Sequence, residues 1–489
     1  MYDTQFFVVV LVVSGAGLAA VLSNRLAAKV AIPAPAFFLL GAAVAATALP
    51  ALHARGQTVE RAVSAALVCI LFAGGLDIGW TRFRSALGAI ATLGVLGTFL
   101  TAGAAAALVH VAFGLSWYAS LLVATAIAPT DPAVVFSVLG RCEIAGRSGL
   151  ILEGESGVND PVGIALMASL VTAGGLSTGA FAQVGWSFLV QMIVGAAVGV
   201  VGGRALLLFV TRVPLPIESL YPLRTLASAF VLYGAASLAH GSGLLAVFVA
   251  GIVLGHERVP YKGEIEHFHA ALASLGEIVA FTVLGLTVDL SVIVRPDVWV
   301  PGLALGAALA FVVRPALVGA CLAPAKLPPD QRNFVLFAGL KGAVPILLGT
   351  FIVTARLADA ERLYGIVVVV VVFSVLVQGS LVPTVARLLH LPMRTVELEP
   401  WSLGVRLQEE PTSVHRFVVA PGSAAEGCTI DGLHDLPANA WISLVVRGGR
   451  ILAVSGDTEL HAGDDVLVVA DLEPGQDLGA AFERRRGDG

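Results

Sequence analysis

Charged residues are scarce in this sequence, and their scarcity excludes a soluble globular protein. Asp, Glu, Lys and Arg make up 13% of the 489 residues, against 57% hydrophobic residues and a mean hydropathy of +0.89. Such values are typical of polytopic membrane proteins. We therefore expect the lipid bilayer to be the main solvent of the chain.

Cysteines and aromatic residues are also few. The four cysteines, Cys69, Cys142, Cys321 and Cys428, show neither CxxC nor CxxH spacing, so neither a disulfide framework nor a zinc site is indicated. The 54 glycines and 7% aromatic residues predict closely packed helices, because small residues let backbones approach in lipid. The N-terminus lacks the basic segment of a signal peptide, so we expect its first apolar run to be a membrane span.

Apolar segments of spanning length recur along residues 1–394. They predict an all-α polytopic membrane domain of about thirteen transmembrane helices. The segments are 5–23, 35–51, 61–79, 85–113, 116–140, 148–174, 184–210, 219–239, 242–256, 270–288, 297–323, 331–355 and 363–391. The boundary between the fifth and the sixth depends on a turn predicted at 141–147.

Lysine and arginine are distributed unequally between alternate connections. With the N-terminus outside, fifteen fall in inner connections and five in outer ones. The positive-inside rule favours this orientation, and an odd number of spans then puts the C-terminus in the cytoplasm. We expect a multi-pass protein of the inner (plasma) membrane. The inner residues are Arg25, Lys29, Arg82, Arg84, Arg141, Arg147, Arg204, Arg212, Arg224, Arg258, Lys262, Lys326, Arg332, Arg387 and Arg394; the outer ones are Arg55, Arg61, Arg295, Arg356 and Arg362.

The character of the chain changes beyond residue 394. Residues 395–489 contain 16 acidic residues and 7 arginines, whereas residues 1–394 contain 18 acidic and 22 basic residues. We expect a transmembrane domain over 1–394, a linker over 395–413 and a small α+β cytoplasmic domain over 414–489. Strands are predicted at 417–420, 441–446, 450–454 and 465–470, with turn residues between them.

Two predicted spans contain residues that interrupt a helix at membrane depth. The span 116–140 has Pro129 and Pro132 on either side of Asp131, and the span 331–355 contains Ala338-Gly-Leu-Lys-Gly-Ala-Val-Pro345. Unwound backbone at this depth needs partners from protein or water, and a pair of broken helices indicates a transport site. The two spans run in opposite directions, as inverted repeats would, although no residue-level repeat is evident.

The span 148–174 carries the most polar group of residues. Glu155 and Asn159 are four apart and share a helix face, and Asp160 follows one position later, all beside Ser156. A carboxylate in hydrocarbon costs about 2.5–3.5 kcal/mol, so acids retained there are expected to have a function. Carboxylate, hydroxyl and amide oxygens suit a hard monovalent cation, and a carboxylate can hold a proton instead. If both compete for Asp160, and the site opens to one side at a time only when occupied, cation is exchanged for proton.

Two cations also lie at membrane depth. Arg314 and Lys341 would be as costly as the acids if unpaired. We predict that Arg314 pairs with Glu155 and that Lys341 offsets the negative ends of the broken helices. Glu277 is the alternative partner of Arg314.

With these residues in view, the sequence resembles the monovalent cation/proton antiporters of the NhaP/NHE type. Three segments carry the resemblance in the same order as in that family: Thr130-Asp-Pro132, Glu155-Ser-Gly-Val-Asn-Asp160 and Gly339-Leu-Lys-Gly-Ala-Val-Pro345. The resemblance covers roughly residues 1–395. It implies a secondary transporter that works by alternating access, a homodimer in the bilayer, and no enzymatic activity.

The resemblance also implies roles for single residues. Asp160 is expected to bind both the cation and the proton, surrounded by Thr130, Asp131, Glu155 and Ser156. The pair formed by Asn159 and Asp160 implies electroneutral exchange, whereas two adjacent acids accompany electrogenic relatives. Lys341 departs from the family, which usually has arginine here, and lysine lacks the planar guanidinium fork.

Residues 414–489 resemble the TrkA-C regulatory module. The resemblance rests on the strand pattern and on Val419-Ala-Pro-Gly-Ser423 and Gly463-Asp-Asp-Val-Leu467. This module is a ligand-binding dimer attached to potassium transporters and channels, so it brings the chain close to bacterial potassium/proton antiporters. It favours K⁺ over Na⁺, although no motif reports the size of the ion site. It also implies a small anionic ligand that regulates transport, such as a cyclic dinucleotide. No other cofactor and no nucleic-acid partner are expected.

Two functions of other classes fit parts of the sequence. Gly154-Glu-Ser-Gly157 has the GxSG form of intramembrane serine proteases, with Ser156 as nucleophile and His110 or His240 as base. This alternative leaves the other buried charges unexplained. A cation channel would need a continuous pore and would show no proton coupling.

The stretch 256–269 concentrates three histidines, His256, His267 and His269, among acidic residues. We interpret it as a solvated loop at the cytoplasmic face. A pH-sensing role is the alternative, because histidine titrates near neutrality.

Overall fold

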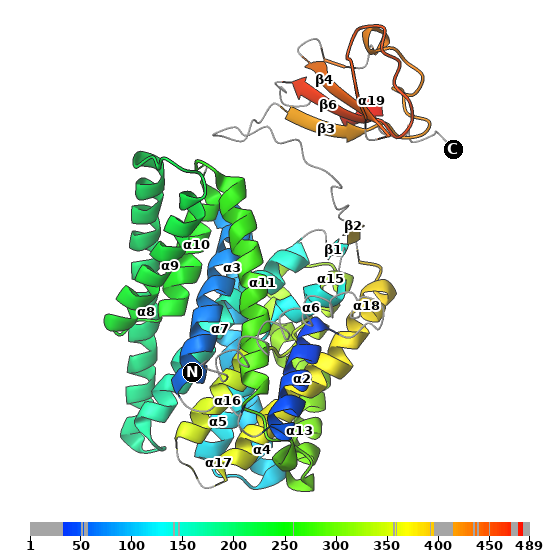
Figure 1. Cartoon of the computed structure of the whole chain (residues 1–489). Helices are drawn as coiled ribbons and strands as arrows, with labels where there is room; N and C mark the ends of the chain where they lie inside the picture. Colours follow the sequence, from blue (N-terminus) through cyan, green and yellow to red (C-terminus); the bar gives the residue numbers. More distant parts are fainter. Residues whose placement is uncertain are drawn as a thin grey trace, which may run out of the picture. The chain divides into compact units, whose positions relative to one another are not determined.

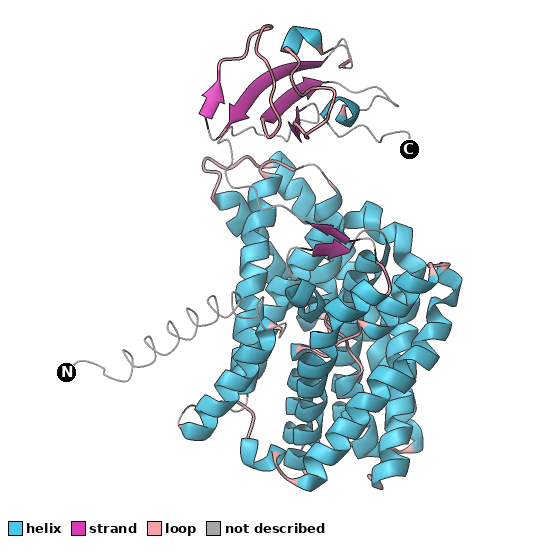
Figure 2. Ribbon diagram, turned by 90° about the vertical axis from the view of Figure 1, so that its right-hand side faces the viewer, coloured by secondary structure: helices cyan, strands magenta, loops and turns pink. Residues whose placement is uncertain are grey.

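The computed structural model divides into two units, Met1–Leu403 and Gly404–Gly489. The first is a bundle of helices and the second is built around a small sheet (Figures 1 and 2). The structure describes residues 33–49, 52, 57–139, 142–144, 147–257, 259–355, 357, 359–391, 393–395, 414–433, 436–437, 440–448, 450–470 and 478–482. The predicted fold class, a helical membrane domain followed by a small α+β domain, is confirmed.

The described helices of the first unit follow the predicted spans closely. They are α2 (Ala34–Ala48), α3 (Gln57–Ala91), η2 (Thr92–Gly97), α4 (Thr98–Phe113), α5 (Trp117–Ile127), α6 (Pro132–Leu139), α7 (Arg147–Ala173), α8 (Thr178–Arg212), α9 (Leu220–Leu238), α10 (Gly243–His256), α11 (Lys262–Gly285), α12 (Leu290–Ile293), α13 (Pro296–Ala308), η3 (Leu309–Val318), α14 (Gly319–Leu322), η4 (Ala323–Ala325), α15 (Pro329–Phe337), α16 (Ala343–Thr354), α17 (Ala360–Phe373), η5 (Ser374–Gln378) and α18 (Gly379–Leu388). The first predicted span, 5–23, lies outside the described residues.

Six helical stretches in the described part of the chain, some of them interrupted by a break or a kink, are long and apolar enough to cross a membrane. They are Gln57–Phe113, Trp117–Leu139, Gly179–Arg212, Lys262–Gly285, Pro296–Leu322 and Ala360–Leu388. Three shorter apolar helices accompany them, at Ala34–Ala48, Gly243–His256 and Ala343–Thr354. Two of the short helices correspond to the short segments predicted at 35–51 and 242–256, and the third is half of a broken helix.

One predicted boundary takes a different form. The spans predicted at 61–79 and 85–113 are joined without a loop, because α3 continues through a kink at Gly79, where φ is 59°. A Cβ atom at this position would lie 3.1 Å from the carbonyl oxygen of Gly255 in α10. Glycine therefore serves two purposes here, since it adopts the left-handed conformation and lets α3 approach α10 closely.

Three segments of the described helices are π-helix. They are η2, η3 and η5, and each lies within a longer helical stretch. Such segments frequently occur at functional sites, because they change the direction in which side chains point. In this protein η3 carries Arg314, and η5 carries Ser374 and Gln378.

The turn predicted at 141–147 contains a short strand. β1 (Cys142–Ile144) pairs antiparallel with β2 (Met393–Thr395), so that Glu143 lies opposite Arg394. The prediction of a simple turn was therefore wrong, because a three-residue strand is too short to show a period. This pairing also includes Thr395, the first residue of the predicted linker, whose remaining residues lie outside the described part.

The second unit contains a four-stranded antiparallel sheet. Its strands are β3 (Val414–Val418), β4 (Ala440–Arg447), β5 (Arg450–Leu452) and β6 (Asp465–Ala470), in the order β3-β6-β4-β5. The short helix α19 (Gly479–Phe482) supplies Phe482, which is fully buried and stacks on Phe417 at 5.0 Å between ring centroids. Alternate burial along β6 gives this domain its own hydrophobic core.

Candidate functional site

The first broken helix consists of α5 and α6. Pro129 and Pro132 lack a backbone N–H, and a residue that precedes proline disfavours the helical conformation, so the helix stops at Ile127 and restarts at Pro132. Asp131 stands directly before α6, where its Oδ1 accepts a hydrogen bond of 2.9 Å from the Ala133 N–H. Its carboxylate therefore caps the positive end of α6.

The second broken helix consists of α15 and α16, and it crosses the first at their breaks. The Asp131 N–H donates to the Leu340 carbonyl oxygen at 2.8 Å. A Cβ atom on Gly342 would overlap the Asp131 carboxylate, so only glycine permits this approach. Figure 1 draws α5 and α16 in the lower part of the bundle and α6 and α15 in the upper part. The two broken helices therefore run in opposite directions, as the sequence predicts.

Lys341 connects the two breaks. Its Nζ donates to the carbonyl oxygens of Ala128 at 2.8 Å and Pro129 at 3.1 Å, which follow the C-terminal end of α5. A cation at this position offsets the negative end of the helix. The side chain is 5% exposed and has no ion pair within the described residues. We predicted that Lys341 offsets the negative ends of the broken helices, and its hydrogen bonds to Ala128 and Pro129 fit that role. These partners are backbone carbonyl oxygens rather than the carboxylate of an acid.

A second layer of polar side chains supports the crossing. The backbone N–H of Lys341 donates to Ser374 Oγ at 2.9 Å, Ser374 Oγ donates to Gln378 Oε1 at 3.0 Å, and Gln378 Nε2 donates to the Phe337 carbonyl oxygen at 2.6 Å. Ser374 and Gln378 were missed in the sequence. The sequence signals them by a spacing of four residues, shortly after a run of valines, which places both polar side chains on one face of a helix.

Helix α7 carries the carboxylate at the centre of the site. Asp160 is 6% exposed, and its Oδ2 accepts a hydrogen bond of 3.4 Å from Ser156 Oγ. Its Oδ1 is buried and has no partner among the described residues. A buried carboxylate oxygen without a partner is costly, so such an atom marks a position for an ion or a proton.

Asn159 and Thr130 link α7 to the first break. Asn159 Nδ2 donates to Thr130 Oγ1 at 2.8 Å, and Thr130 Oγ1 donates to Glu155 Oε1 at 3.4 Å. The Asn159 Oδ1 atom is buried without a partner in the described part of the chain. Gly163 allows the close approach, because a Cβ there would meet the ring of Pro129. Hydroxyl, amide and carboxylate oxygens from two elements thus gather around one point.

Glu155 is fully engaged in an ion pair. Arg314 Nη1 and Nη2 donate to Glu155 Oε1 and Oε2, each at 2.9 Å, and the two side chains are 7% and 3% exposed. The guanidinium also donates to the carbonyl oxygens of Leu336 at 3.1 Å and Val335 at 3.3 Å. Arg314 therefore has the partner that the sequence predicted, and it makes no contact with Glu277 within the described residues.

The site brings together most of the predicted residues. Thr130, Asp131, Glu155, Ser156, Asn159, Asp160, Arg314 and Lys341 lie around the two breaks, joined by the contacts given above. Glu277 in α11 is partly exposed, and it has neither a hydrogen bond nor an ion pair in the described part of the chain. It stands apart from the network.

The serine protease alternative has no support in the structure. The described hydrogen bond of Ser156 Oγ is to Asp160, not to a histidine. His110 Nδ1 instead contacts the Leu115 carbonyl oxygen at 2.7 Å, and the His110 ring stacks on Trp117. His240 lies in the turn between α9 and α10, with φ at 60°. Ser156 therefore has no general base within the described residues.

The interpretation of 256–269 as a loop is also wrong over most of its length. From Lys262 onward the chain is helix α11, and His269 is completely buried. Its Nε2 lies 2.9 Å from Thr225 Oγ1, and its ring packs edge-on against Phe72. The charged residues near the start of α11 suggested a solvated loop. The buried residues of this helix nevertheless recur at helical spacing and form an apolar face.

A helical membrane protein in which two broken helices cross beside a buried carboxylate is built as a secondary transporter. The family model for the transmembrane sodium/hydrogen exchanger matches residues 17–388, and the TrkA-C domain model matches residues 414–482. The chain therefore belongs to the sodium/hydrogen exchanger family, as a cation/proton antiporter with a C-terminal TrkA-C domain. The predictions of an antiporter and of no enzyme are confirmed, and the channel alternative has no support.

Individual relatives agree with this assignment. The K(+)/H(+) antiporter NhaP of Alkalimonas amylolytica is 34% identical over 426 residues, which cover 85% of this chain and 72% of the relative. The K(+)/H(+) antiporter NhaP2 of Shewanella oneidensis is 32% identical over 411 residues, or 83% and 70% of the two chains. The sodium proton antiporter MjNhaP1 from Methanocaldococcus jannaschii has a similar fold, with a TM-score of 0.62 at 21% identity over 76% of this chain and 99% of that chain.

Proposed function

We propose that this antiporter exchanges K⁺, in preference to Na⁺, for H⁺ by electroneutral alternating access. The preference for K⁺ is supported by the relatives named K(+)/H(+) antiporters, which are 32–34% identical over more than four fifths of this chain. A relative named a low-affinity Na(+)/H(+) antiporter is 28% identical over 58% of the chain. Both ions suit oxygen ligands, so the choice between them depends on the size of the site.

Asp160 is the residue that carries cation and proton in turn. The observation that supports this role is its Oδ1, which is buried at the crossing without a partner in the described residues. Such an oxygen gains a partner when either a cation or a proton arrives, and both cannot occupy it together. The Ser156 and Thr130 hydroxyls, Asn159 Oδ1 and the Asp131 carboxylate supply further oxygens around it.

Electroneutral exchange follows from the neighbour of Asp160. Asn159 occupies the position where a second acid would add a second titrating group, and its amide donates to Thr130 at 2.8 Å. An amide releases no proton in this pH range, and Glu155 is held by Arg314 at 2.9 Å. One titrating carboxylate then moves one proton for one monovalent cation.

The charged pairs around Asp160 have supporting roles in this proposal. Glu155 and Arg314 tie α7 to η3 and to the last carbonyl groups of α15. Lys341 ties α16 to the end of α5 through Ala128 and Pro129. The two broken helices are thereby fastened to each other, so we expect them to move as one body when the site changes sides.

The proposed orientation puts the N-terminus outside and the C-terminal domain in the cytoplasm. It is supported by the excess of Lys and Arg in alternate connections, and a plasma (inner) membrane location fits it. It also puts the end of the bundle that holds α6, α15 and the β1–β2 pair on the cytoplasmic side. The helix ends near α12 and the start of α17 then face outward.

The C-terminal domain has a regulatory role in this proposal. We expect it to form a dimer, to bind a small anionic ligand such as a cyclic dinucleotide, and to adjust the transport rate. The match to the TrkA-C model over residues 414–482 supports this role. A chain truncated after Thr395, which keeps β2, should then transport K⁺ at a rate that no longer responds to the added nucleotide. An identical response in the full and the truncated chain would contradict the role.

The main experiment measures transport in proteoliposomes, with internal pH and membrane potential recorded together. Wild-type protein is expected to acidify or alkalinise the lumen in response to a K⁺ gradient without changing the potential. Asp160→Asn should abolish this proton movement, whereas Ser156→Ala should only weaken it, because Ser156 supplies one long hydrogen bond. Asp330→Asn, at a partly exposed acid in the first turn of α15, is the control. Normal exchange by the Asp160→Asn protein would refute the mechanism.

A further inference from the structure

Glu277 is the acid at membrane depth that the proposed mechanism leaves unused. It lies in α11, eight residues before the helix ends at Gly285, or about 12 Å along the helix axis. Within the described residues it has neither a hydrogen bond nor an ion pair, and its helix α11 packs against α16, which begins directly after Gly342 beside Asp131. Burying a carboxylate at this depth costs about 2.5–3.5 kcal/mol, and no hydrogen bond or ion pair among the described residues offsets this cost. Such an acid is therefore expected to have a function.

Glu277 differs from the other buried acids in its access to space. Glu155 and Asp160 are 3% and 6% exposed, whereas Glu277 is partly exposed. Its neighbour Gly276 packs close to α3, where a Cβ would lie 3.0 Å from the Ala66 carbonyl oxygen. The helix is therefore fixed tightly on one side, while the partly exposed Glu277 side chain makes no hydrogen bond or ion pair with the described residues that would keep it from binding a small ion.

The helix face that carries Glu277 leads towards a cavity. Phe281 and Leu284 follow it at helical spacing, and Val288 stands three residues beyond the end of the helix; they are 1%, 0% and 2% exposed. Val288 lines a cavity of about 200 Å³ between the ends of α3, α11, α16 and α17. In the proposed orientation this cavity is on the outer side. Phe281 and Leu284 thus form an apolar barrier between Glu277 and the outer cavity.

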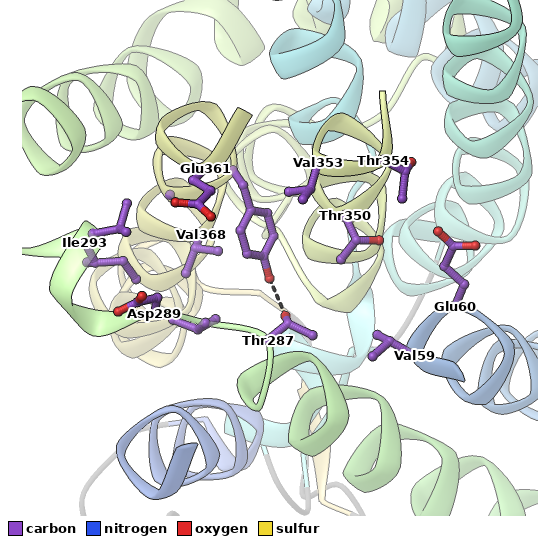
Figure 3. Close-up of a pocket in the computed structure, with 14 residues that line it drawn as sticks. Val59, Glu60, Thr287, Asp289, Ile293, Thr350, Val353, Thr354, Glu361 and Val368 are labelled. Atoms are coloured by element: carbon purple, nitrogen blue, oxygen red, sulfur yellow. Dashed lines mark hydrogen bonds between the residues drawn. The ribbon is translucent and has the colours of Figure 1, made fainter. Parts of the chain in front are cut away.

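The outer cavity has a composition that suits an entrance for cations. Glu60, Asp289 and Glu361 line it, and no Lys, Arg or His is among its described lining residues (Figure 3). A cleft lined by charge of one sign raises the local concentration of the opposite ion. At its wall Thr287 Oγ1 lies 2.5 Å from the Tyr364 hydroxyl, a hydrogen bond that joins the chain after α11 to α17.

From these contacts we propose that Glu277 is a further cation- and proton-binding residue of the transport path, between the Asp131–Asp160 site and the outer cavity. Its carboxylate takes the ion that leaves Asp160 when the barrier at Phe281 and Leu284 opens. An occupied Glu277 is favoured over an empty one, because a bound cation or proton removes the cost of an uncompensated negative charge at membrane depth. This inference rests on the proposed function and deepens it, since it assigns the outward half of the path to one face of α11.

The test compares full-length variants in proteoliposomes over a range of K⁺ concentrations. Glu277→Gln is expected to raise the apparent KM for K⁺ about tenfold, which corresponds to the loss of about 1.4 kcal/mol of binding. Glu277→Asp should keep a KM near that of the wild type, because the charge remains. Glu264→Gln is the matched control, at an exposed acid in the first turn of the same helix.

The outcomes separate this inference from the proposed function. If wild-type protein moves no protons in response to K⁺, the proposed function is wrong. If the wild type is active and Glu277→Gln has the KM of Glu264→Gln, only the role of Glu277 is wrong. Equal losses of maximal rate in Glu277→Gln and Glu277→Asp at unchanged KM would indicate a structural acid and would also overturn the proposal.

A second measurement does not depend on activity. Glu277→Cys, in a chain whose native cysteines are replaced by alanine, is exposed to a membrane-impermeant, negatively charged methanethiosulfonate. We expect the reagent to react with the cysteine, because a residue on the path is reached by water-borne ions, and to lower the KM by restoring a negative charge. No reaction from either side of the membrane would refute a position on the path.

Discussion

The ion pair between Glu155 and Arg314 allows a quantitative prediction about stability. Arg314 donates four hydrogen bonds, two to Glu155 at 2.9 Å and one each to the carbonyl oxygens of Leu336 and Val335. Removing one partner of a buried pair costs about 3–5 kcal/mol, since the other charge stays buried without compensation. Both single variants, Glu155→Gln and Arg314→Met, should therefore be clearly less stable than the wild type.

The contacts also predict the order of the variants. In Glu155→Gln the amide oxygen still accepts from Arg314, and Arg314 keeps its two carbonyl partners. In Arg314→Met the Glu155 carboxylate keeps only the Thr130 hydroxyl, 3.4 Å away, and both carbonyl groups lose their donor. Arg314→Met should thus be the less stable single variant. The double variant removes both charges, so we expect it to exceed Arg314→Met in stability by about 2 kcal/mol.

The assay heats each detergent-solubilised variant and measures the fraction that remains monodisperse on size-exclusion chromatography. The exchanged pair Glu155→Arg with Arg314→Glu should recover part of the stability that Arg314→Glu loses. Glu277→Arg with Arg314→Glu is the control and should recover none. Two results would refute this reasoning. In the first, the double neutral variant loses as much stability as the two single variants together. In the second, Glu277→Arg rather than Glu155→Arg restores the stability of Arg314→Glu; either result would show that the ion pair does not stabilise the protein.

Two further predictions concern the crossing and the tail. Gly342→Ala should abolish transport while the protein still inserts, because its Cβ would overlap the Asp131 carboxylate; Gly103→Ala, where a Cβ meets nothing, should transport normally. In the C-terminal domain, burial of Asp464 acts to raise its pKa, but hydrogen bonds from Arg447 and from a backbone N–H outweigh it, so the pKa of Asp464 lies below its usual value. A lowered pKa in the folded state adds stability above the unfolded value of about 3.9, and this stability is lost as the pH falls through the folded pKa. Hydrogen exchange of β4 and β6 in the full chain should therefore accelerate below about pH 4, and less so in Arg447→Met; equal acceleration in both would contradict this account.

The sequence by itself determined the bundle, the two breaks and the identity of the central acids. Hydropathy and helical period are local properties, so twelve of the predicted spans coincide with helices of the described residues. Proline and glycine act on their own backbone, which is why Pro129, Pro132 and Gly342 could be assigned to breaks without a structure. The cost of a carboxylate in lipid likewise drew attention to Asp131, Glu155 and Asp160, and the resemblance to the antiporter family then implied that Asp160 is the ion-binding acid among them.

Only the tertiary structure decided which charges meet. Glu155 and Arg314 are 159 positions apart, and both Glu155 and Glu277 were suitable partners in the sequence. The structure also gave Lys341 backbone oxygens as partners and added Ser374 and Gln378, which no local pattern connects to it. Partners of this kind depend on how helices cross, and crossing is set by the packing of glycines and side chains from distant segments. Among the residues that the structure describes, the same packing gives Glu277 neither a hydrogen bond nor an ion pair, a fact that no stretch of α11 could have revealed.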